Sequence, residues 1–384
     1  MKKILVFSSY GGGGHISATD TIKEYLNPHS YKIDTVYLID EVLGCLDLIK
    51  LCTRGKYSQE KLYNFCLRKK WTWFINKLYQ LGLFLTCLNE KIIKRIITAY
   101  LLKQKPDLVI SVVPLFNNMI KDSCKECNIP FLLIPTDLDS TSFVGTITNP
   151  IYKDFILTIP FDDDDILKFS VNSSITNYNK KITGFPIKPA FFKIKDIDAI
   201  KKEFNVPADT FTILVLMGAA GSQATYYYLL TLLELSQRVH IIICLGRNEA
   251  LRKNLEKITV PIHITLSIIS YTNRISDLMS ISNVCITKAG TVSVCEAIYM
   301  NLPIILDNTS TPLYWEKFNI GFIQKNKFGI VVTHYDQLNN AVTKMMHDSS
   351  YYHECVRNLT NFPKKEFGNY LNPLIEQLLN AQKI

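Results

Sequence analysis

The chain begins with an apolar run that leads into four consecutive glycines and a histidine. Residues 8–15 read SSYGGGGH, between a predicted strand, Lys3–Ser8, and a predicted helix that starts at His15. Glycine lets the backbone approach a ligand closely, and a helix N-terminus favours a negative charge or a developing oxyanion. An imidazole there can face the cleft at the strands' carboxyl ends, which makes His15 a candidate base. The same residues also fit a tight turn with a solvent-facing histidine.

Three strand ends in the second half of the chain carry small residues or cations. They are Gly218–Ser222, Gly246-Arg247-Asn248 and Lys288-Ala289-Gly290, and Glu296 follows on the next predicted helix. Amides and cations neutralise phosphate, and a carboxylate can accept hydrogen bonds from two ribose hydroxyls. The set therefore points to a diphosphate and a sugar ring. Glu296 also fits an ordinary helix-surface acid, and Arg247 fits a structural ion pair.

The elements that position these residues alternate between strand-length apolar runs and helical patterns. Two such series predict an α/β protein with two doubly wound parallel sheets. Gly184, Pro186 and Pro189 mark a turn-rich linker between them. We expect an N-terminal domain over 1–186 with a helical insertion at about 41–105, a C-terminal domain over 187–362, and a final helix in 363–384 that packs back on the first domain.

Composition and charge limit the classes of protein that fit. The 384 residues are 47% hydrophobic and 20% charged, which excludes a disordered chain. Ten scattered cysteines and the lack of a secretory leader favour reduced thiols in the cytoplasm. Cys124 and Cys127 fit a helix that carries reduced thiols. The four acids Asp162–Asp165 fit the start of a helix. We therefore expect no metal and no cofactor.

The net charge of +9 is concentrated in one segment. Thirteen basic and two acidic residues, Glu60 and Glu90, lie between Lys50 and Lys105, which gives +11 there and −2 elsewhere. Cations beside amphipathic rings suit an anionic membrane surface. The candidate membrane residues are Arg68, Lys69, Lys70, Trp71, Trp73 and Phe74.

Two other interpretations of this segment stay open. Its rings can pack on the sheet beneath a solvated basic face, or it can bind nucleic acid, although no recognised nucleic-acid module is present. The uncharged stretch Thr210–Leu233 is long enough to span a bilayer, but its glycines and polar residues favour a strand, a turn and a helix.

Several motifs, taken together and in order, resemble those of a known family. They are the glycines with His15, Thr136-Asp137, residues 183–187 (TGFPI), Gly246-Arg247-Asn248, Lys288-Ala289-Gly290 with Glu296-Ala297, and Pro303-Ile304-Ile305. Over about residues 1–375 the chain looks like the monogalactosyldiacylglycerol synthases and the processive diacylglycerol glucosyltransferases. The peptidoglycan-precursor N-acetylglucosaminyltransferase is a more distant relative.

This resemblance implies the GT-B fold, with two Rossmann-like domains that face a cleft, and an inverting, metal-independent transfer of a hexose from a UDP-sugar. His15 would be the base or would orient the acceptor, with Asp137 as the second candidate or its partner. Glu296 would hold the ribose, and the backbone around Ser270–Thr272, with Tyr271 in the middle, would hold the uracil. The other residues implied in UDP-sugar binding are Gly14, Gly218, Gly221, Ser222, Arg247, Lys288, Gly290, Thr291, Val292, Ser293 and Glu316.

The resemblance also implies a lipid acceptor, diacylglycerol or its glycoside, and a peripheral enzyme on the cytoplasmic face of a membrane. The chain departs from the family pattern at Thr291-Val292, at Trp315 and at residues 139–143. These departures leave open a catalytically degenerate module that binds a membrane or a partner. A nucleotide-sugar epimerase, whose sheets and cleft look alike, is the other alternative.

Overall fold

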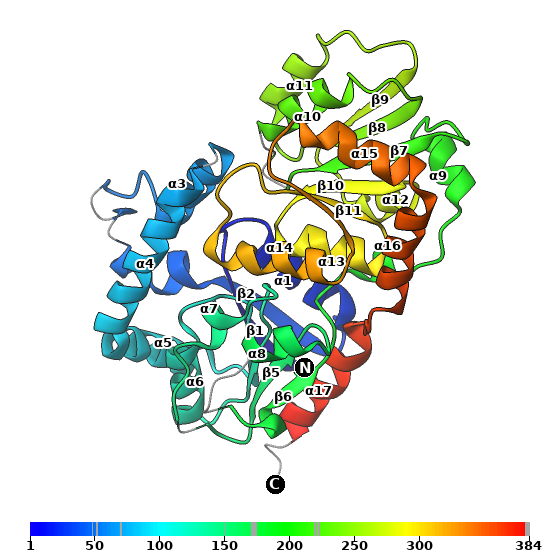
Figure 1. The fold of residues 1–384 in the computed structure, drawn as a ribbon. Coiled ribbons are helices and arrows are strands. Elements are labelled where there is room, and N and C mark those ends of the chain that lie inside the picture. Colours follow the sequence, from blue (N-terminus) through cyan, green and yellow to red (C-terminus); the bar gives the residue numbers. More distant parts are fainter. Residues whose placement is uncertain are drawn as a thin grey trace. The chain divides into compact units, whose positions relative to one another are not determined.

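The chain folds into two compact units, each built around one parallel sheet (Figure 1). The computed structural model describes residues 1–47, 49–50, 53–69, 71–149, 151–169, 175–218, 221 and 223–380. Unit 1 consists of Met1–Phe65, Phe74–Pro189 and Pro363–Ile384, and unit 2 of Cys66–Trp73 and Ala190–Phe362. The break at Pro189 lies three residues beyond the predicted linker boundary.

The sheet of unit 1 has six parallel strands in the order β2-β1-β3-β4-β5-β6. Its strands are β1 (Lys2–Ser8), β2 (Tyr31–Tyr37), β3 (Leu108–Ser111), β4 (Phe131–Leu133), β5 (Phe155–Ile159) and β6 (Lys180–Ile182). Strands β3, β4 and β5 are buried throughout. Such continuous apolar runs are typical of parallel strands that helices cover on both faces.

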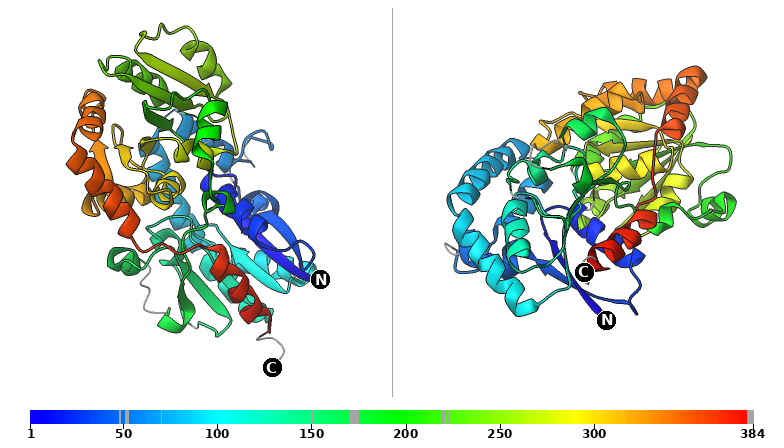
Figure 2. Two further views of the ribbon diagram at one scale, coloured as in Figure 1. Left: turned by 90° about the vertical axis from the view of Figure 1, so that its right-hand side faces the viewer. Right: turned by 90° about the horizontal axis from the view of Figure 1, so that it is seen from below.

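Alternate residues of β1 enter two different cores, as the period of two in a strand requires. Ile4 and Val6 pack with α1 (Gly14–Tyr25) and α17 (Gly368–Asn380), whereas Leu5 and Phe7 face α5 (Glu90–Gln104) and α6 (Asn117–Glu126). The last helix, α17, thus lies alongside the strands of unit 1, as both views in Figure 2 show.

The segment between β2 and β3 is helical. Its elements are the π-helix Leu38–Val42, the short 3-10 helix Gly44–Leu46, α3 (Gln59–Arg68), α4 (Thr72–Leu88) and α5. The later short elements of unit 1 are α7 (Thr141–Val144), α8 (Asp164–Phe169) and the 3-10 helices Asn177–Asn179 and Pro189–Phe191, the last of which spans the break.

Unit 2 repeats the doubly wound plan, with strand order β12-β11-β10-β7-β8-β9. Its strands are β7 (Phe211–Leu216), β8 (Val239–Cys244), β9 (Ile264–Ile269), β10 (Val284–Lys288), β11 (Ile304–Asp307) and β12 (Gly329–Val332). Its helices are α9 (Ile197–Glu203), α10 (Ala224–Leu232), α11 (Glu249–Leu255), α12 (Ile275–Ser280), α13 (Thr291–Tyr299), the 3-10 helix Tyr314–Glu316, α14 (Lys317–Lys325), α15 (Gln337–His347) and α16 (Ser349–Asn361).

Two predictions about the fold are confirmed. Both sheets are parallel and doubly wound, and the uncharged stretch from residue 210 to 233 forms strand β7 and helix α10. Among the described residues, the helices are too short or too polar to span a bilayer.

Candidate functional site

In unit 1, three neighbouring strand ends meet at His15, the second residue of α1. Its Nδ1 atom lies 2.7 Å from the carbonyl oxygen of Val112, which follows β3. The same nitrogen lies 3.1 Å from Oγ1 of Thr136, which lies three residues beyond the end of β4. Because β1, β3 and β4 are adjacent parallel strands, their carboxyl ends share one edge of the sheet.

These contacts fix the tautomer of the imidazole. A carbonyl oxygen only accepts hydrogen bonds, so Nδ1 of His15 must carry the hydrogen that it donates to Val112, and Nε2 keeps its lone pair. Burial lowers the pKa of His15 to about 4, although the hydrogen bond to the Val112 carbonyl opposes this shift. The ring is therefore neutral at pH 7, with one nitrogen able to accept a proton.

Asp137, the second candidate base, directly follows Thr136 and is half-buried. The next residues turn back into α7, where Asp139 accepts a hydrogen bond of 2.9 Å from the Thr141 amide. The Phe143 ring lies 6.5 Å from the His15 ring, centroid to centroid. The segment that departs from the family pattern thus supplies an apolar neighbour of the imidazole, and the role of Asp137 stays a prediction.

The loop before His15 is held by side chains of the insertion. The Tyr10 amide donates to Glu60 Oε1 over 2.9 Å, and the Gly12 amide donates to Asn64 Oδ1 over 3.0 Å. These contacts join residues 50 and 52 positions apart, and neither acceptor was a predicted site residue. The only signal in the sequence is that Glu60 is one of two acids in an otherwise basic segment.

In unit 2, the strand ends predicted to bind a diphosphate lie side by side. Gly218 and Gly221 both have positive φ angles, +81° and +70°. A Cβ atom on Gly221 would lie 2.2 Å from the Leu245 carbonyl oxygen, so only glycine lets the loop after β7 touch the loop after β8. A Cβ atom on Gly218 would lie 3.4 Å from Cε of Lys288, the last residue of β10.

Helix α13 begins beside a cation and a carboxylate. The Lys288 ammonium pairs with Glu316 Oε1 at 2.6 Å, and Glu316 is buried. A Cβ atom on Gly290, which precedes the helix, would lie 3.3 Å from Lys288 Nζ and 3.6 Å from Glu316 Oε1. The structure therefore brings Gly218, Lys288, Gly290 and Glu316 together at one edge of the sheet.

The first turn of α13 is anchored from α14. Buried Asn319 donates to the Ala289 carbonyl oxygen over 2.7 Å and to Thr291 Oγ1 over 3.1 Å. Val292 and Ser293 are half-buried on that turn, and Glu296 is half-buried on the next. The hydroxyl group of Thr291 is thus used in a contact to Asn319, and Gly290, directly before this turn, lies beside Lys288.

Arg247 follows β8 and contacts an aromatic ring. Its guanidinium carbon lies 4.7 Å from the centroid of Tyr271, and both side chains are exposed. The loop that carries Tyr271 is held by Arg252, which donates to Ser270 Oγ over 2.8 Å. A flat, exposed pair at the ends of β8 and β9 suits stacking of a nucleobase.

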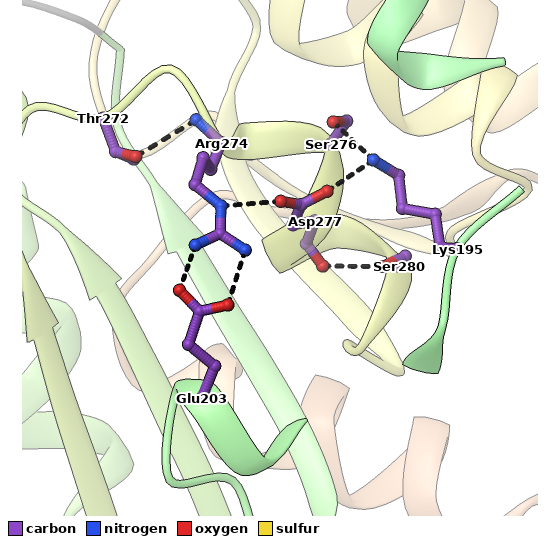
Figure 3. Close-up of polar contacts among 7 residues, drawn as sticks. All are labelled: Lys195, Glu203, Thr272, Arg274, Ser276, Asp277 and Ser280. Carbon is purple, nitrogen blue, oxygen red and sulfur yellow. Dashed lines mark hydrogen bonds and ion pairs between the residues drawn. The ribbon is translucent and has the colours of Figure 1, made fainter. Parts of the chain in front are cut away.

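A charged network fixes the segment that follows Tyr271 (Figure 3). Arg274 donates to Asp277 from Nε over 2.7 Å and forms two hydrogen bonds to the Glu203 carboxylate of α9. Lys195 completes the network with a 2.5 Å contact to Asp277. The hydrogen bonds from Arg274 lower the pKa of Glu203.

Helices α3, α4 and α5 expose an apolar and basic surface, which we call the α4 surface. Along α4, exposed side chains recur at helical spacing on one face, and they are Trp73, Lys77, Leu81, Phe84 and Leu88. Residues 50–105 supply nine of the twenty most exposed large apolar side chains in the described part of the chain. Large apolar patches on a protein surface often mark interaction sites, so the α4 surface is a candidate docking surface.

Some predicted residues are only partly described. Ser222 and Lys70 lie outside the described residues, as does the side chain of Arg68. Lys69, Trp71 and Trp73 are exposed, and Phe74 is half-buried. Among the described side chains, no three of His, Cys, Asp and Glu are grouped as a metal site would require.

Comparison with known proteins finds a family model that matches part of unit 2 and relatives that are similar over most of the chain. Residues 212–308 match the family model described as the glycosyltransferase family 28 C-terminal domain. The processive diacylglycerol beta-glucosyltransferase of Bacillus subtilis (strain 168) is 23% identical, covering 100% of this chain and 96% of the relative. The probable monogalactosyldiacylglycerol synthase 2 (chloroplastic) of Oryza sativa subsp. indica is 23% identical over 80% of this chain and 66% of the relative.

Solved structures with low sequence identity share the fold. MurG of Acinetobacter baumannii superimposes with a TM-score of 0.62 at 12% identity, covering 98% of this chain and 100% of that chain. The UDP-GlcNAc 2-epimerase of Neisseria meningitidis, solved with bound UDP-GlcNAc, gives a TM-score of 0.57 at 15% identity, covering 99% and 100%.

The structural neighbours define the fold as GT-B. More particularly, residues 212–308 of unit 2 are similar to the glycosyltransferase family 28 C-terminal domain. The resemblance to the processive diacylglycerol glucosyltransferases and the monogalactosyldiacylglycerol synthases is confirmed over nearly the whole chain.

The burial of His15 leads to a prediction about its ionisation. Because burial disfavours the charged ring, we expect His15 to take up a proton only near pH 4, not near 6.5. Loss of activity through this group should likewise begin only near pH 4. NMR titration of the imidazole, with the signal assigned through a His15→Gln variant, measures the midpoint. A midpoint near 6.5, or a proton on Nε2 at pH 7, would contradict the assigned tautomer and environment.

Proposed function

We propose that the chain is an inverting glycosyltransferase that moves a hexose from a UDP-sugar to a hydroxyl group of a diacylglycerol-like lipid. Its place would be the cytoplasmic face of a membrane, as a peripheral enzyme. The observation that carries this proposal is the neutral His15 with an unprotonated Nε2, in a chain whose residues 212–308 are similar to the glycosyltransferase family 28 C-terminal domain. The names of the relatives support a lipid acceptor.

The edge of the sheet in unit 2 would hold the donor. Diphosphate oxygens would bind at the first turn of α13, beside the Lys288 ammonium and next to Gly218. Glu296, one turn further, would accept hydrogen bonds from the ribose, and uracil would stack near Tyr271 and Arg247. The neighbour solved with UDP-GlcNAc supports a UDP-sugar donor.

The reaction would then need few groups. Nε2 of His15 accepts the proton of the acceptor hydroxyl as that oxygen attacks the anomeric carbon of the hexose from the face opposite UDP. The bond from the anomeric carbon to the phosphate oxygen breaks, and UDP leaves with both electrons. Because the attack comes from the face opposite UDP, the configuration at the anomeric carbon is inverted. Lys288 and the amides at the start of α13 stabilise the charge on the leaving diphosphate, so no metal ion is needed.

The α4 surface would place this chemistry at a membrane. The described basic residues exposed in the segment 50–105 are Arg54, Lys56, Lys61, Lys69, Lys77, Lys91, Arg95, Lys103 and Lys105. Each cation near an anionic surface contributes about 1 kcal/mol, and exposed rings such as those of Trp73 and Phe84 add apolar transfer energy. This combination fits helices that lie in the plane of the interface.

A nucleotide-sugar epimerase is the second candidate, because one structural neighbour is a UDP-GlcNAc 2-epimerase. An epimerase has no lipid substrate, so an epimerase function does not explain the α4 surface. Conversion of a UDP-sugar to its epimer in the absence of any acceptor would favour this alternative over transfer.

The donor site makes a first prediction. Gly221→Ala should weaken UDP binding at least tenfold by calorimetry, because the new methyl group would collide with the Leu245 carbonyl oxygen. Gly321→Ala is the matched control, since a Cβ atom at this position of α14 meets nothing within 4 Å. Equal affinities for both variants would remove the loop after β7 from the donor site.

The base makes a second prediction. With UDP-sugar and diacylglycerol vesicles, His15→Ala should lower kcat by a factor of about 10²–10⁴, the usual worth of a general base, and leave the Kd for UDP unchanged. His29→Ala, which alters an exposed histidine elsewhere in unit 1, serves as the control. Full turnover by the His15 variant would end its assigned role, and wild-type turnover that EDTA abolishes would end the metal-free mechanism.

The membrane surface makes a third prediction. Replacing Arg68, Lys69 and Lys70 together with glutamine should weaken binding to anionic vesicles at least tenfold in a sedimentation assay, without changing the affinity for UDP. A triple variant of Lys153, Lys193 and Lys202, which are exposed outside the segment, makes the same change in net charge. Equal loss in both triples would mean that only net charge matters.

A further inference from the structure

One face of helix α3 lies on the glycine loop that leads to His15. Glu60, Tyr63 and Asn64 have the spacing i, i+3 and i+4, which places them on the same side of the helix. Cβ atoms built on Gly11 and Gly12 would each lie 3.8 Å from the Tyr63 ring. The loop is therefore packed against the ring and flanked by two polar side chains.

Glu60 makes the most constrained of these contacts. Its side chain is 5% exposed, and Oε1 accepts a hydrogen bond of 2.5 Å from Ser9 Oγ and one of 2.9 Å from the Tyr10 amide. Ser9 Oγ in turn accepts from the Gly11 amide over 3.0 Å. A single carboxylate oxygen thus orders two successive residues of the loop, and a third through the serine.

Asn64 holds the following residues in the same way. Its Oδ1 accepts from the Gly12 amide over 3.0 Å, and its Nδ2 donates to the Tyr10 carbonyl oxygen over 2.9 Å. The amides of Tyr10, Gly11 and Gly12 are therefore all used inside the protein. These hydrogen bonds hold this part of the loop in one conformation. In this loop, only the residues after Gly12 keep backbone amides that could contact a ligand.

A run of four glycines has no preferred conformation of its own. Ordering the backbone of a typical residue costs about 1–2 kcal/mol of conformational free energy. Glycine gives up more backbone freedom than any other residue, so its cost is higher. His15 directly follows this run, so the loop conformation decides where the imidazole faces. A displacement of about 1 Å at a reacting group costs up to about 100-fold in rate.

We propose that Glu60 is a positioning residue for glycosyl transfer, which through Ser9 and Tyr10 holds the glycine loop in the one conformation that presents His15 to the acceptor. This role rests on the proposed function. Glu60 touches neither substrate, and it acts only through the backbone that precedes α1.

The surroundings of the second carboxyl oxygen of Glu60 explain why this side chain can hold the loop without a negative charge. Oε2 is buried, and no donor faces it, whereas the Asp40 carboxyl group is its neighbour. Burial, together with this carboxyl group, raises the pKa of Glu60 to about 7. The neutral acid can donate from Oε2 towards Asp40 while Oε1 still accepts from the loop. A glutamine has the same shape and the same pair of functions.

The experiment compares Glu60→Ala, Glu60→Gln and Gln59→Ala, the last an exposed neighbour on α3 that serves as the control. With UDP-sugar and diacylglycerol vesicles, and rates normalised to UDP-binding sites, Glu60→Ala should lower kcat about 10- to 100-fold. Its KM for the donor should be unchanged. Glu60→Gln should keep the wild-type kcat within about threefold. Hydrogen exchange of the peptide covering residues 9–14 should be faster in Glu60→Ala alone.

The outcomes separate this inference from the proposed function. If the wild-type protein turns over and Glu60→Ala does so equally, or if Glu60→Gln is as impaired as Glu60→Ala, the positioning role is overturned and the proposed function stands. If the wild type binds UDP but transfers no sugar to any lipid, the proposed function fails and this role fails with it. Unchanged exchange in residues 9–14 of Glu60→Ala would also overturn the role.

Discussion

The carboxyl ends of parallel strands meet at one edge of a sheet, and both candidate sites are built on that constraint. At this edge the backbone turns into loops whose amides and side chains can all face the same ligand. In unit 1 the edge brings His15, Val112 and Thr136 within hydrogen-bond distance. In unit 2 it brings Gly218, Lys288 and Gly290 together beside Glu316.

The edge of the sheet brings the strand-end loops together, but it does not by itself hold each loop in one conformation. Each site adds a side chain from a distant element for this purpose. Glu60 of the insertion fixes the glycine loop, and Asn319 of α14 fixes the start of α13. Glycine is needed at the points of closest approach, and such side chains offset the conformational freedom that glycine introduces.

The sequence alone was sufficient for the parts of this account that depend on local patterns. The apolar runs predicted the parallel strands, and the residues that follow them predicted the two groups of strand-end loops. Contacts between residues far apart in the chain leave no such pattern. The hydrogen bond of Tyr10 to Glu60, the tautomer set by Val112 and the pairing of Lys288 with Glu316 all required the structure. The charge count contained one sign of such contacts that the sequence analysis did not use. Glu60 and Glu90 are the only acids of the basic segment, and both make hydrogen bonds within unit 1.

In the proposed function, the carboxyl edge of the sheet in unit 2 holds the diphosphate of the donor. A crystal structure of the protein soaked with UDP tests it most directly. We expect diphosphate oxygens within hydrogen-bond distance of the first-turn amides of α13 and of the Lys288 ammonium, next to Gly218. UDP bound elsewhere, or no UDP at a saturating concentration, would contradict it.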